Sequence, residues 1–187
     1  MQEIPKDTLT LAQQGDIRAF EDIYRTSSGF VYTLALRVTN NRQDAEEVAQ
    51  DVFLKVYKNI RKFRFESTFK TWIYRITTNT AINAAIRRGR RAMREIEYND
   101  NIQHTHGYEP QQEKIEKDEK EQIIKSMLET LNPKQRSCLV LRDIEGLSYE
   151  EISRTLKINI NTVRSRLKRA RESLLALRKK GVIKNVL

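Results

Sequence analysis

The segment NTVRSRLKRARESL, residues 161–174, concentrates side chains that bind phosphates and base edges. An apolar stripe runs along it: Val163, Leu167, Ala170 and Leu174. This spacing is that of one helix face, which predicts a helix packed on the rest of the protein along the stripe. Arginine and lysine take up most of the remaining circumference. An arginine can pair with the two acceptors of guanine, and lysines suit phosphates, so the helix is expected to bind a polyanion.

A shorter helix is predicted just before this basic one. Ser148 and Glu151 have the spacing of a capping box that starts it, and the residues KINI supply a tight turn after it. Together they form a helix-turn-helix, whose second helix enters the major groove with its N-terminal turns. The residues expected at base edges are Asn161, Thr162, Arg164, Ser165 and Arg166, and those expected at phosphates are Lys168, Arg169 and Arg171. A plain helical hairpin with solvated charges is the alternative. The clustering of basic residues on the second helix favours DNA binding.

A second stretch, residues 61–75, interleaves aromatic and basic side chains. The aromatic residues are Phe63, Phe65, Phe69, Trp72 and Tyr74, and the basic ones are Arg61, Lys62, Arg64, Lys70 and Arg75. Such interleaving suits unpaired bases, which stack on rings while cations hold the backbone. The alternative is a hydrophobic core, because Phe69, Trp72 and Ile73 share one helical face, and for Trp72 burial is favoured. The loop 61–68 has no helical periodicity, so the nucleic-acid interpretation applies mainly to the side chains of this loop.

Composition indicates small helical domains with a charged partner. Of the 187 residues, 39% are hydrophobic and 32% charged, and 6 Gly and 3 Pro are too few for a turn-rich all-β fold. The net charge of +10 divides into +6 over residues 1–93, −5 over residues 94–121 and +9 over residues 122–187. Two basic blocks around an acidic one suggest a polyanion bound at two places.

Periodicity and capping signals predict an all-α fold of two small domains. In residues 1–94, a short helix closed by Gly15 precedes a long helix capped by Asp16, which ends at residues 40–41. A third helix has an apolar face and an acidic and amide face, and a fourth follows the aromatic loop. Residues 95–120 are polar and acidic, as in a flexible linker. Residues 121–187 form the helix-turn-helix domain, with a helix starting at Asn132 and Pro133.

Other features limit the function classes. Cys138 lies in the apolar run CLVL and is expected to be a buried thiol, and His104 and His106 are expected to be solvated linker residues rather than metal ligands. No apolar stretch has the roughly 20 residues of a membrane span, and the N-terminus does not resemble a signal peptide, so a cytoplasmic location is expected. No cofactor, metal or catalytic constellation is expected.

Four segments, in this order along the chain, resemble the signature regions of extracytoplasmic-function (ECF) sigma factors of the sigma-70 family. They are GDIRAFEDIY, DAEEVAQDVFLKVY, FRFESTFKTWIYRITTN and LSYEEISRTLKININTVRSRLKRARESL. The resemblance covers nearly the whole chain apart from the linker and the extreme termini. The last segment alone also resembles response-regulator DNA-binding modules, but the ordered set is specific to sigma factors.

The resemblance implies partners and roles for particular residues. The third helix would bind the β′ clamp helices of core RNA polymerase through Asp44, Glu47, Gln50 and Asp51, and the C-terminal domain would meet the β flap. The −10 promoter element would be melted and held by Arg61, Lys62, Phe63, Arg64, Phe65, Ser67, Thr68, Thr71, Trp72, Asn79, Asn83, Arg87 and Arg88. The helix-turn-helix would read the −35 element, the linker would follow the RNA-exit path, and an anti-sigma factor would hold the protein inactive. The family performs no covalent chemistry.

Four positions depart from the family pattern. The family usually has Gly where Phe65 stands, Asp and a basic residue where Asn83 and Ala84 stand, and commonly Gly where Asn161 stands. Two rival interpretations compete with the sigma factor. A two-domain regulator of duplex DNA would need neither the acidic face of the third helix nor the aromatic loop. A metal-dependent nuclease would need convergent carboxylates, whereas the acidic residues here lie on an outward helix face or in the linker.

Overall fold

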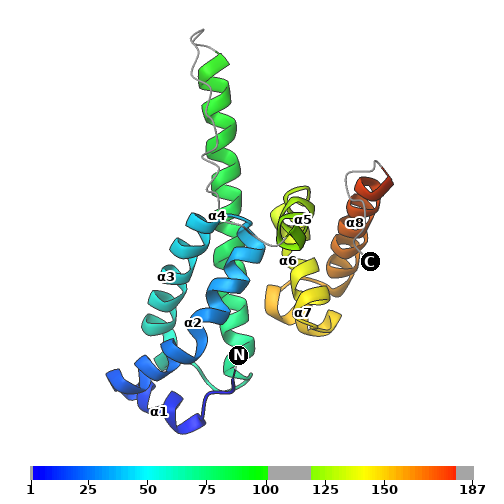
Figure 1. Cartoon of the computed structure of the whole chain (residues 1–187). Helices are drawn as coiled ribbons and strands as arrows, with labels where there is room; N and C mark the ends of the chain where they lie inside the picture. Colours follow the sequence, from blue (N-terminus) through cyan, green and yellow to red (C-terminus); the bar gives the residue numbers. More distant parts are fainter. Residues whose placement is uncertain (1, 101–118, 180–187) are drawn as a thin grey trace.

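The computed structural model describes residues 2–100 and 119–179, and every regular element in these ranges is helical (Figure 1). The all-α prediction is confirmed. The N-terminal elements are α1 (Lys6–Gln14), α2 (Ile17–Thr39), α3 (Arg42–Asn59), η1 (Ile60–Lys62) and α4 (Phe69–Asp100). Helices α2, α3 and α4 pack side by side around a core that includes Ile23, Leu34, Val52 and Ile73, while α1 lies against α2 and η1. Helix α4 continues beyond residue 94, where the first domain was predicted to end.

Local capping determines where these helices begin and end, as the sequence predicted. Gly15 ends α1 with a φ of 100°, a conformation that glycine adopts without steric cost. The Asp16 carboxylate accepts a hydrogen bond from the backbone N–H of Ala19 at 3.0 Å and so starts α2. Asn40, with φ 54°, ends α2, and the Asn41 side chain caps α3 by accepting from the N–H of Asp44 at 2.8 Å.

The C-terminal domain contains α5 (Glu119–Glu129), α6 (Pro133–Leu139), the π-helical turn η2 (Val140–Ile144), α7 (Tyr149–Leu156) and α8 (Ile160–Lys179). Capping boxes start α6 and α7, the latter from the predicted Ser148 and Glu151. Val163, Leu167 and Ala170 of α8 are at most 1% exposed, which confirms the predicted packing face of the basic helix. Cys138 is buried and unpaired, and burial raises the pKa of its thiol.

The two domains are packed against each other, and their buried apolar residues belong to one cluster to which polar contacts are added. At the end of η2, Glu145 forms an ion pair with Arg37 of α2 at 2.7 Å and accepts a hydrogen bond from the Tyr74 hydroxyl of α4 at 2.8 Å. The Glu145 side chain is only 13% exposed. Burial and the bond to Glu145 raise the pKa of Tyr74 well above its usual value, so the hydroxyl is protonated and can donate at neutral pH.

A second inter-domain contact lies at the C-terminal end of α2. Arg136 of α6 is 5% exposed and donates hydrogen bonds to the backbone oxygens of Val38 at 3.3 Å and Thr39 at 3.0 Å. It also donates to the oxygen of Leu131 at 2.9 Å. Burial lowers the pKa of the Arg136 guanidinium to about 10, so it is still charged at neutral pH. This cation therefore satisfies carbonyls that the end of a helix leaves without intrahelical partners.

Replacing Glu145 with alanine should lower the free energy of unfolding by about 1–3 kcal/mol, because Tyr74 and Arg37 lose a largely buried charged acceptor. Urea denaturation of Glu145→Ala, Tyr74→Phe and the double variant measures this loss and the coupling between the two residues. Glu150→Ala, an exposed residue of α7, is the control and should stay within about 0.5 kcal/mol of the parent protein. Additive effects of Glu145→Ala and Tyr74→Phe would show that the inter-domain bond is not formed in solution.

Candidate nucleic-acid interface

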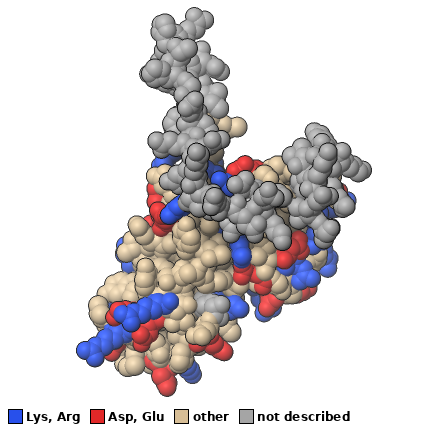
Figure 2. Space-filling view, in the orientation of Figure 1, with Lys and Arg blue, Asp and Glu red and all other residues tan. Residues whose placement is uncertain are grey.

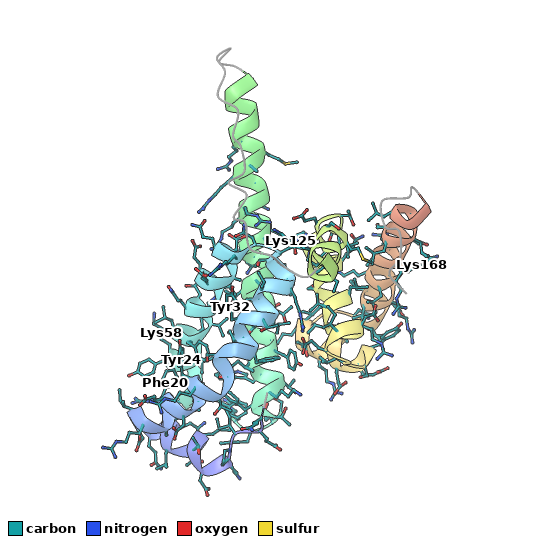
Figure 3. All side chains as sticks on the ribbon, in the orientation of Figure 1. Phe20, Tyr24, Tyr32, Lys58, Lys125 and Lys168 are labelled. Carbon is teal, nitrogen blue, oxygen red and sulfur yellow. The ribbon has the colours of Figure 1, made fainter. Side chains whose placement is uncertain are left out.

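Helix α8 presents one polar and basic surface away from its domain. Asn159 caps the helix by accepting from the backbone N–H of Asn161 at 2.8 Å, and Arg164 donates to the side-chain oxygen of Asn161 at 3.2 Å. Asn161, Arg164, Ser165, Lys168 and Arg169 are all exposed. Lys168 projects from the outer side of α8 (Figure 3). The arrangement brings short polar and basic groups to the first turns of the helix and cations to the turns beyond.

Three predicted contact residues of α8 lie closer to their own domain. Thr162 is half-buried, as is Arg166, which lies beside the buried thiol of Cys138. Arg171 pairs with Asp143 at 2.9 Å, and this hydrogen bond raises the pKa of Arg171. Arg166 and Arg171 therefore each have a partner within the domain, and their predicted contacts with a base edge and a phosphate stay predictions.

An open hollow of about 470 Å³ lies where α3 and η1 meet α4. Its lining combines cations, amides and apolar groups: Lys55, Asn59, Lys62, Trp72, Arg75, Ile76, Asn79, Thr80 and Asn83. Lys55 reaches from α3 to α4 and donates to the hydroxyl of Thr80 at 2.9 Å. Four of the lining residues were predicted contacts for the −10 element, and Arg75 was among the basic residues singled out in the aromatic stretch, whereas Lys55 and Asn59 were missed. The spacing of Arg75, Asn79 and Asn83, four residues apart, would have placed them on one helix face.

The aromatic residues beside the hollow form a cluster, and two predicted DNA contacts lie within it. Phe63 is 6% exposed, with its ring 5.2 Å from that of Trp72 and 6.1 Å from that of Phe69. Trp72 is 9% exposed, so the core alternative is confirmed for it, although it also reaches the wall of the hollow. Phe63 and Trp72 must therefore be counted as packing residues, because neither presents an open ring face to solvent.

Phe65 is the ring of the loop that remains accessible, at 37% exposure. It stacks 4.9 Å from Phe63 and has a φ of 57°, in the left-handed region that a bulky side chain rarely occupies. This conformation explains why the family pattern has glycine there. Thr68 starts α4 by accepting from the N–H of Thr71 at 3.1 Å. The remaining loop residues predicted to bind DNA are exposed: Arg61, Lys62, Arg64 and Ser67.

Beyond the hollow, the arginines of α4 divide into two groups. Arg87 is exposed, as a phosphate contact requires. Arg88 instead pairs with Asp44 of α3 at 3.3 Å and donates to the backbone oxygen of Thr39 at 3.3 Å. Burial raises the pKa of the Asp44 carboxyl more strongly than the charge of Arg88 lowers it. Asp44 and Arg88 therefore help to hold α2, α3 and α4 together, and their predicted contacts with polymerase and DNA stay predictions.

The acidic and amide face of α3 is otherwise open. Glu47, Gln50 and Asp51 are exposed, as predicted. Leu54, one turn after Gln50, is 56% exposed on the same face and was missed. Its position outside the apolar stripe of α3 was the available signal. An apolar side chain among polar ones is typical of the centre of a protein interface.

The surface over α2 and α3 is largely uncharged in the view of Figure 2. Tyr24 and Tyr57 are 48% and 55% exposed. Their rings pack edge-on with Phe53 at 4.6 Å and Phe20 at 5.1 Å. Phe20 and Tyr24 lie at the N-terminal end of α2 (Figure 3). These tyrosine side chains therefore pack on the aromatic residues at the edge of the core and are partly exposed to solvent.

The sequence also led to predictions about metal ligands, membrane spans and the linker. Residues 2–100 and 119–179 contain no cluster of metal-ligating side chains. Within those same ranges, no helix is both long and apolar enough to cross a membrane. His104, His106 and most of the predicted linker lie outside the described residues.

Comparison with known families defines the class of this protein. The model of sigma-70 region 2 matches residues 23–92, and that of sigma-70 region 4 matches residues 121–174. The RNA polymerase sigma-H factor of Pseudomonas aeruginosa is 34% identical over 179 residues, which are 92% of this chain and 93% of the relative. The ECF RNA polymerase sigma-E factor of Haemophilus influenzae is 36% identical over 168 residues, which are 87% of this chain and 88% of the relative. The chain belongs to the ECF sigma factors of the sigma-70 family, which act in transcription initiation.

Solved structures with a similar fold are complexes. CnrH bound to the cytosolic domain of CnrY is 25% identical, with a TM-score of 0.64, and the match covers 92% of this chain and 96% of CnrH. The sigma factor RpoE bound to the anti-sigma factor NepR, from Bartonella quintana, is also 25% identical, with a TM-score of 0.63. That match covers 87% of this chain and 98% of the other.

The left-handed backbone of Phe65 can be tested by comparing Phe65→Gly with Phe65→Ala. Both variants lose the ring, but only alanine keeps a Cβ at positive φ, so the glycine variant should be more stable by about 1 kcal/mol in urea denaturation. Gly29, in the middle of α2, is the control position, because a Cβ added there would meet nothing within 4 Å. At Gly29 alanine should be the more stable residue by about 0.5–1 kcal/mol. The same order at both positions would contradict the positive φ of Phe65.

Proposed function

We propose that this sigma factor binds core RNA polymerase through the exposed face of α3 and directs it to promoters through two DNA-binding surfaces. The first turns of α8 read the −35 element as duplex, and the hollow between α3 and α4 holds the non-template strand of the −10 element. The observation that carries the proposal is the hollow itself, where cations and amides meet beside Trp72, close in sequence to the exposed ring of Phe65. A regulator that binds only duplex DNA has no use for such a site.

The energetics support strand capture at the hollow. Stacking a base on an aromatic side chain contributes about 1–3 kcal/mol. Unstacking a base costs a few kcal/mol, so one or two captured bases offset much of the cost of opening the duplex. Phe65 offers the ring, and Lys62 and Arg75, which line the hollow, offer cations for the backbone. Asn79 and Asn83 add amides that can hydrogen bond to base edges.

The remaining partners follow from the same family membership. We infer that the C-terminal domain also meets the β flap of the polymerase, that the protein acts in the cytoplasm and that it catalyses no reaction itself. The similar structures CnrH–CnrY and RpoE–NepR support a regulatory partner of the anti-sigma class for this chain. The acidic residues 95–120 would follow the RNA-exit path of the polymerase.

The polymerase-binding face can be tested by replacing Gln50 with alanine and Asp51 with lysine in one variant. Placing a cation where the interface expects an anion should weaken binding to core RNA polymerase by about tenfold or more. A fluorescence titration of labelled protein with core enzyme measures this, and circular dichroism checks that helicity is unchanged. Asp22→Lys, an equal charge change on the exposed surface of α2, is the control. Unaltered affinity of the double variant would remove α3 from the interface.

The α8 surface can be tested by separating base reading from phosphate contact. Arg164→Ala should cost about 1–3 kcal/mol of binding and relax the preference at one position of the −35 element. Lys168→Ala should weaken binding to all duplexes alike and reduce the slope of log affinity against log salt by about one. Competition binding on a library of −35 duplexes at several salt concentrations measures both effects. If both substitutions only scale the affinity across the library, Arg164 does not read bases.

A further inference from the structure

Helix α1 lies against the loop that joins α3 to α4, at η1. The family model of region 2 begins at residue 23, so α1 is outside the part of the chain that this model matches. Figure 1 shows α1 across the ends of α2 and α3 where this loop runs. Three of its contacts fall on the loop, and none of them is needed to close the core of α2, α3 and α4.

The first contact is made by Gln13, which is half-buried near the end of α1. Its side-chain amide nitrogen donates to the backbone oxygen of Ile60 at 3.0 Å and to that of Phe63 at 2.6 Å. These carbonyls stand at the two ends of η1, where the backbone N–H of Phe63 also bonds to the oxygen of Ile60 at 3.0 Å. One amide group with two N–H donors therefore fixes both ends of the turn that leads into the loop.

Two further contacts come from the ends of α1. The ammonium group of Lys6 lies 5.3 Å from the centroid of the Phe65 ring, within the range of a cation–π interaction. At Gly15, with φ of 100°, an added Cβ would lie 3.3 Å from a guanidinium nitrogen of Arg61, so the helix end and the loop approach closely. The loop is thus held at its start by Gln13 and at its strained residue by Lys6, and the Arg61 side chain lies close to the end of α1.

A non-glycine residue at positive φ is unfavourable and persists only where surrounding contacts determine it. Phe65 has that backbone, and its ring rests between Phe63 and Lys6. Released from η1 and α1, the loop would relax to more favourable dihedral angles and the ring would leave its place against Phe63. A binding surface that is already in its bound shape loses less conformational freedom on binding.

We propose that α1 is a brace that preorganises the loop 61–68 for capture of an unpaired base, with Gln13 as the positioning residue. The inference rests on the proposed strand-capture function of that loop. Gln13 does not touch DNA in this scheme and acts through the carbonyls of Ile60 and Phe63. The ligand of the braced site is the single-stranded −10 region of a promoter in the polymerase holoenzyme.

A series at Gln13 separates hydrogen bonding from space filling. Gln13→Met keeps the length of the side chain without donors, Gln13→Lys keeps donors, and Gln13→Glu places a carboxylate against two carbonyl oxygens. Gln14→Glu, an exposed neighbour, controls for the added negative charge. Full-length variants are assembled with core RNA polymerase on a promoter fragment that the parent holoenzyme selects from genomic DNA. Permanganate reactivity of unpaired thymines then measures promoter opening, and a fluorescence titration measures holoenzyme assembly.

The opening equilibrium should fall about tenfold for Gln13→Met, the equivalent of about 1.4 kcal/mol. It should fall further for Gln13→Glu and be largely retained for Gln13→Lys and Gln14→Glu, with holoenzyme assembly unchanged throughout. Amide hydrogen exchange in residues 60–68 should accelerate in the methionine and glutamate variants only, which reports the loop itself even if a variant is less stable overall. Equal opening by the glutamine, methionine and lysine proteins would overturn the brace.

The loop variant Phe65→Ala distinguishes failure of the brace from failure of the proposed function. If Phe65→Ala reduces opening and Gln13→Met does not, strand capture by the loop stands and the role of α1 is wrong. If neither substitution changes opening, the loop does not capture the strand, and the inference about α1 falls with it.

Discussion

The end of α2 is the point on which the arrangement of this protein depends. The backbone oxygen of Thr39 accepts from Arg88 of α4 and from Arg136 of α6, so two cations of different domains share one helix terminus. The last carbonyls of a helix have no intrahelical partners and carry partial negative charge, which makes the terminus a favourable place for guanidinium groups. Arg88 also holds Asp44 at the start of α3. The termini of α2 and α3 are thereby tied to α4 and to the C-terminal domain.

This arrangement leaves the functional surfaces outside the contact between the domains. The inter-domain contact uses Tyr74 of α4, whereas Asn79 and Asn83 stay exposed beside the hollow. On the other domain it uses η2, α6 and α7, whereas the outer face of α8 stays open. The contact combines the ion pair and hydrogen bonds of Glu145 and Arg136 with apolar packing, since the buried apolar residues of the two domains belong to one continuous cluster.

Features that depend on neighbouring residues in the sequence could be predicted, and features that depend on distant ones could not. The caps at Gly15, Asp16 and Ser148 and the packing face of α8 follow from residue type and spacing alone, and the structure confirms them. The pairing of Arg88 with Asp44 joins two different helices, and the sequence offers no sign that either side chain leaves the surface. In the sequence Arg136 looks like an ordinary surface arginine, although its guanidinium is buried against the other domain. The same holds for Phe63, whose burial depends on α4 closing over the loop, and for Phe65, whose left-handed backbone is imposed by contacts from both sides.

The central claim is that this chain makes core RNA polymerase start transcription at defined promoters. The most direct measurement is run-off transcription by core polymerase on a pool of genomic promoter fragments, with and without the protein, followed by mapping of the 5′ ends. We predict discrete start sites that depend on the protein and share two upstream sequence blocks at fixed spacing. Transcripts with the same starting points in both reactions, from a protein that nonetheless binds duplex DNA, would contradict the claim and identify a regulator that acts without the polymerase.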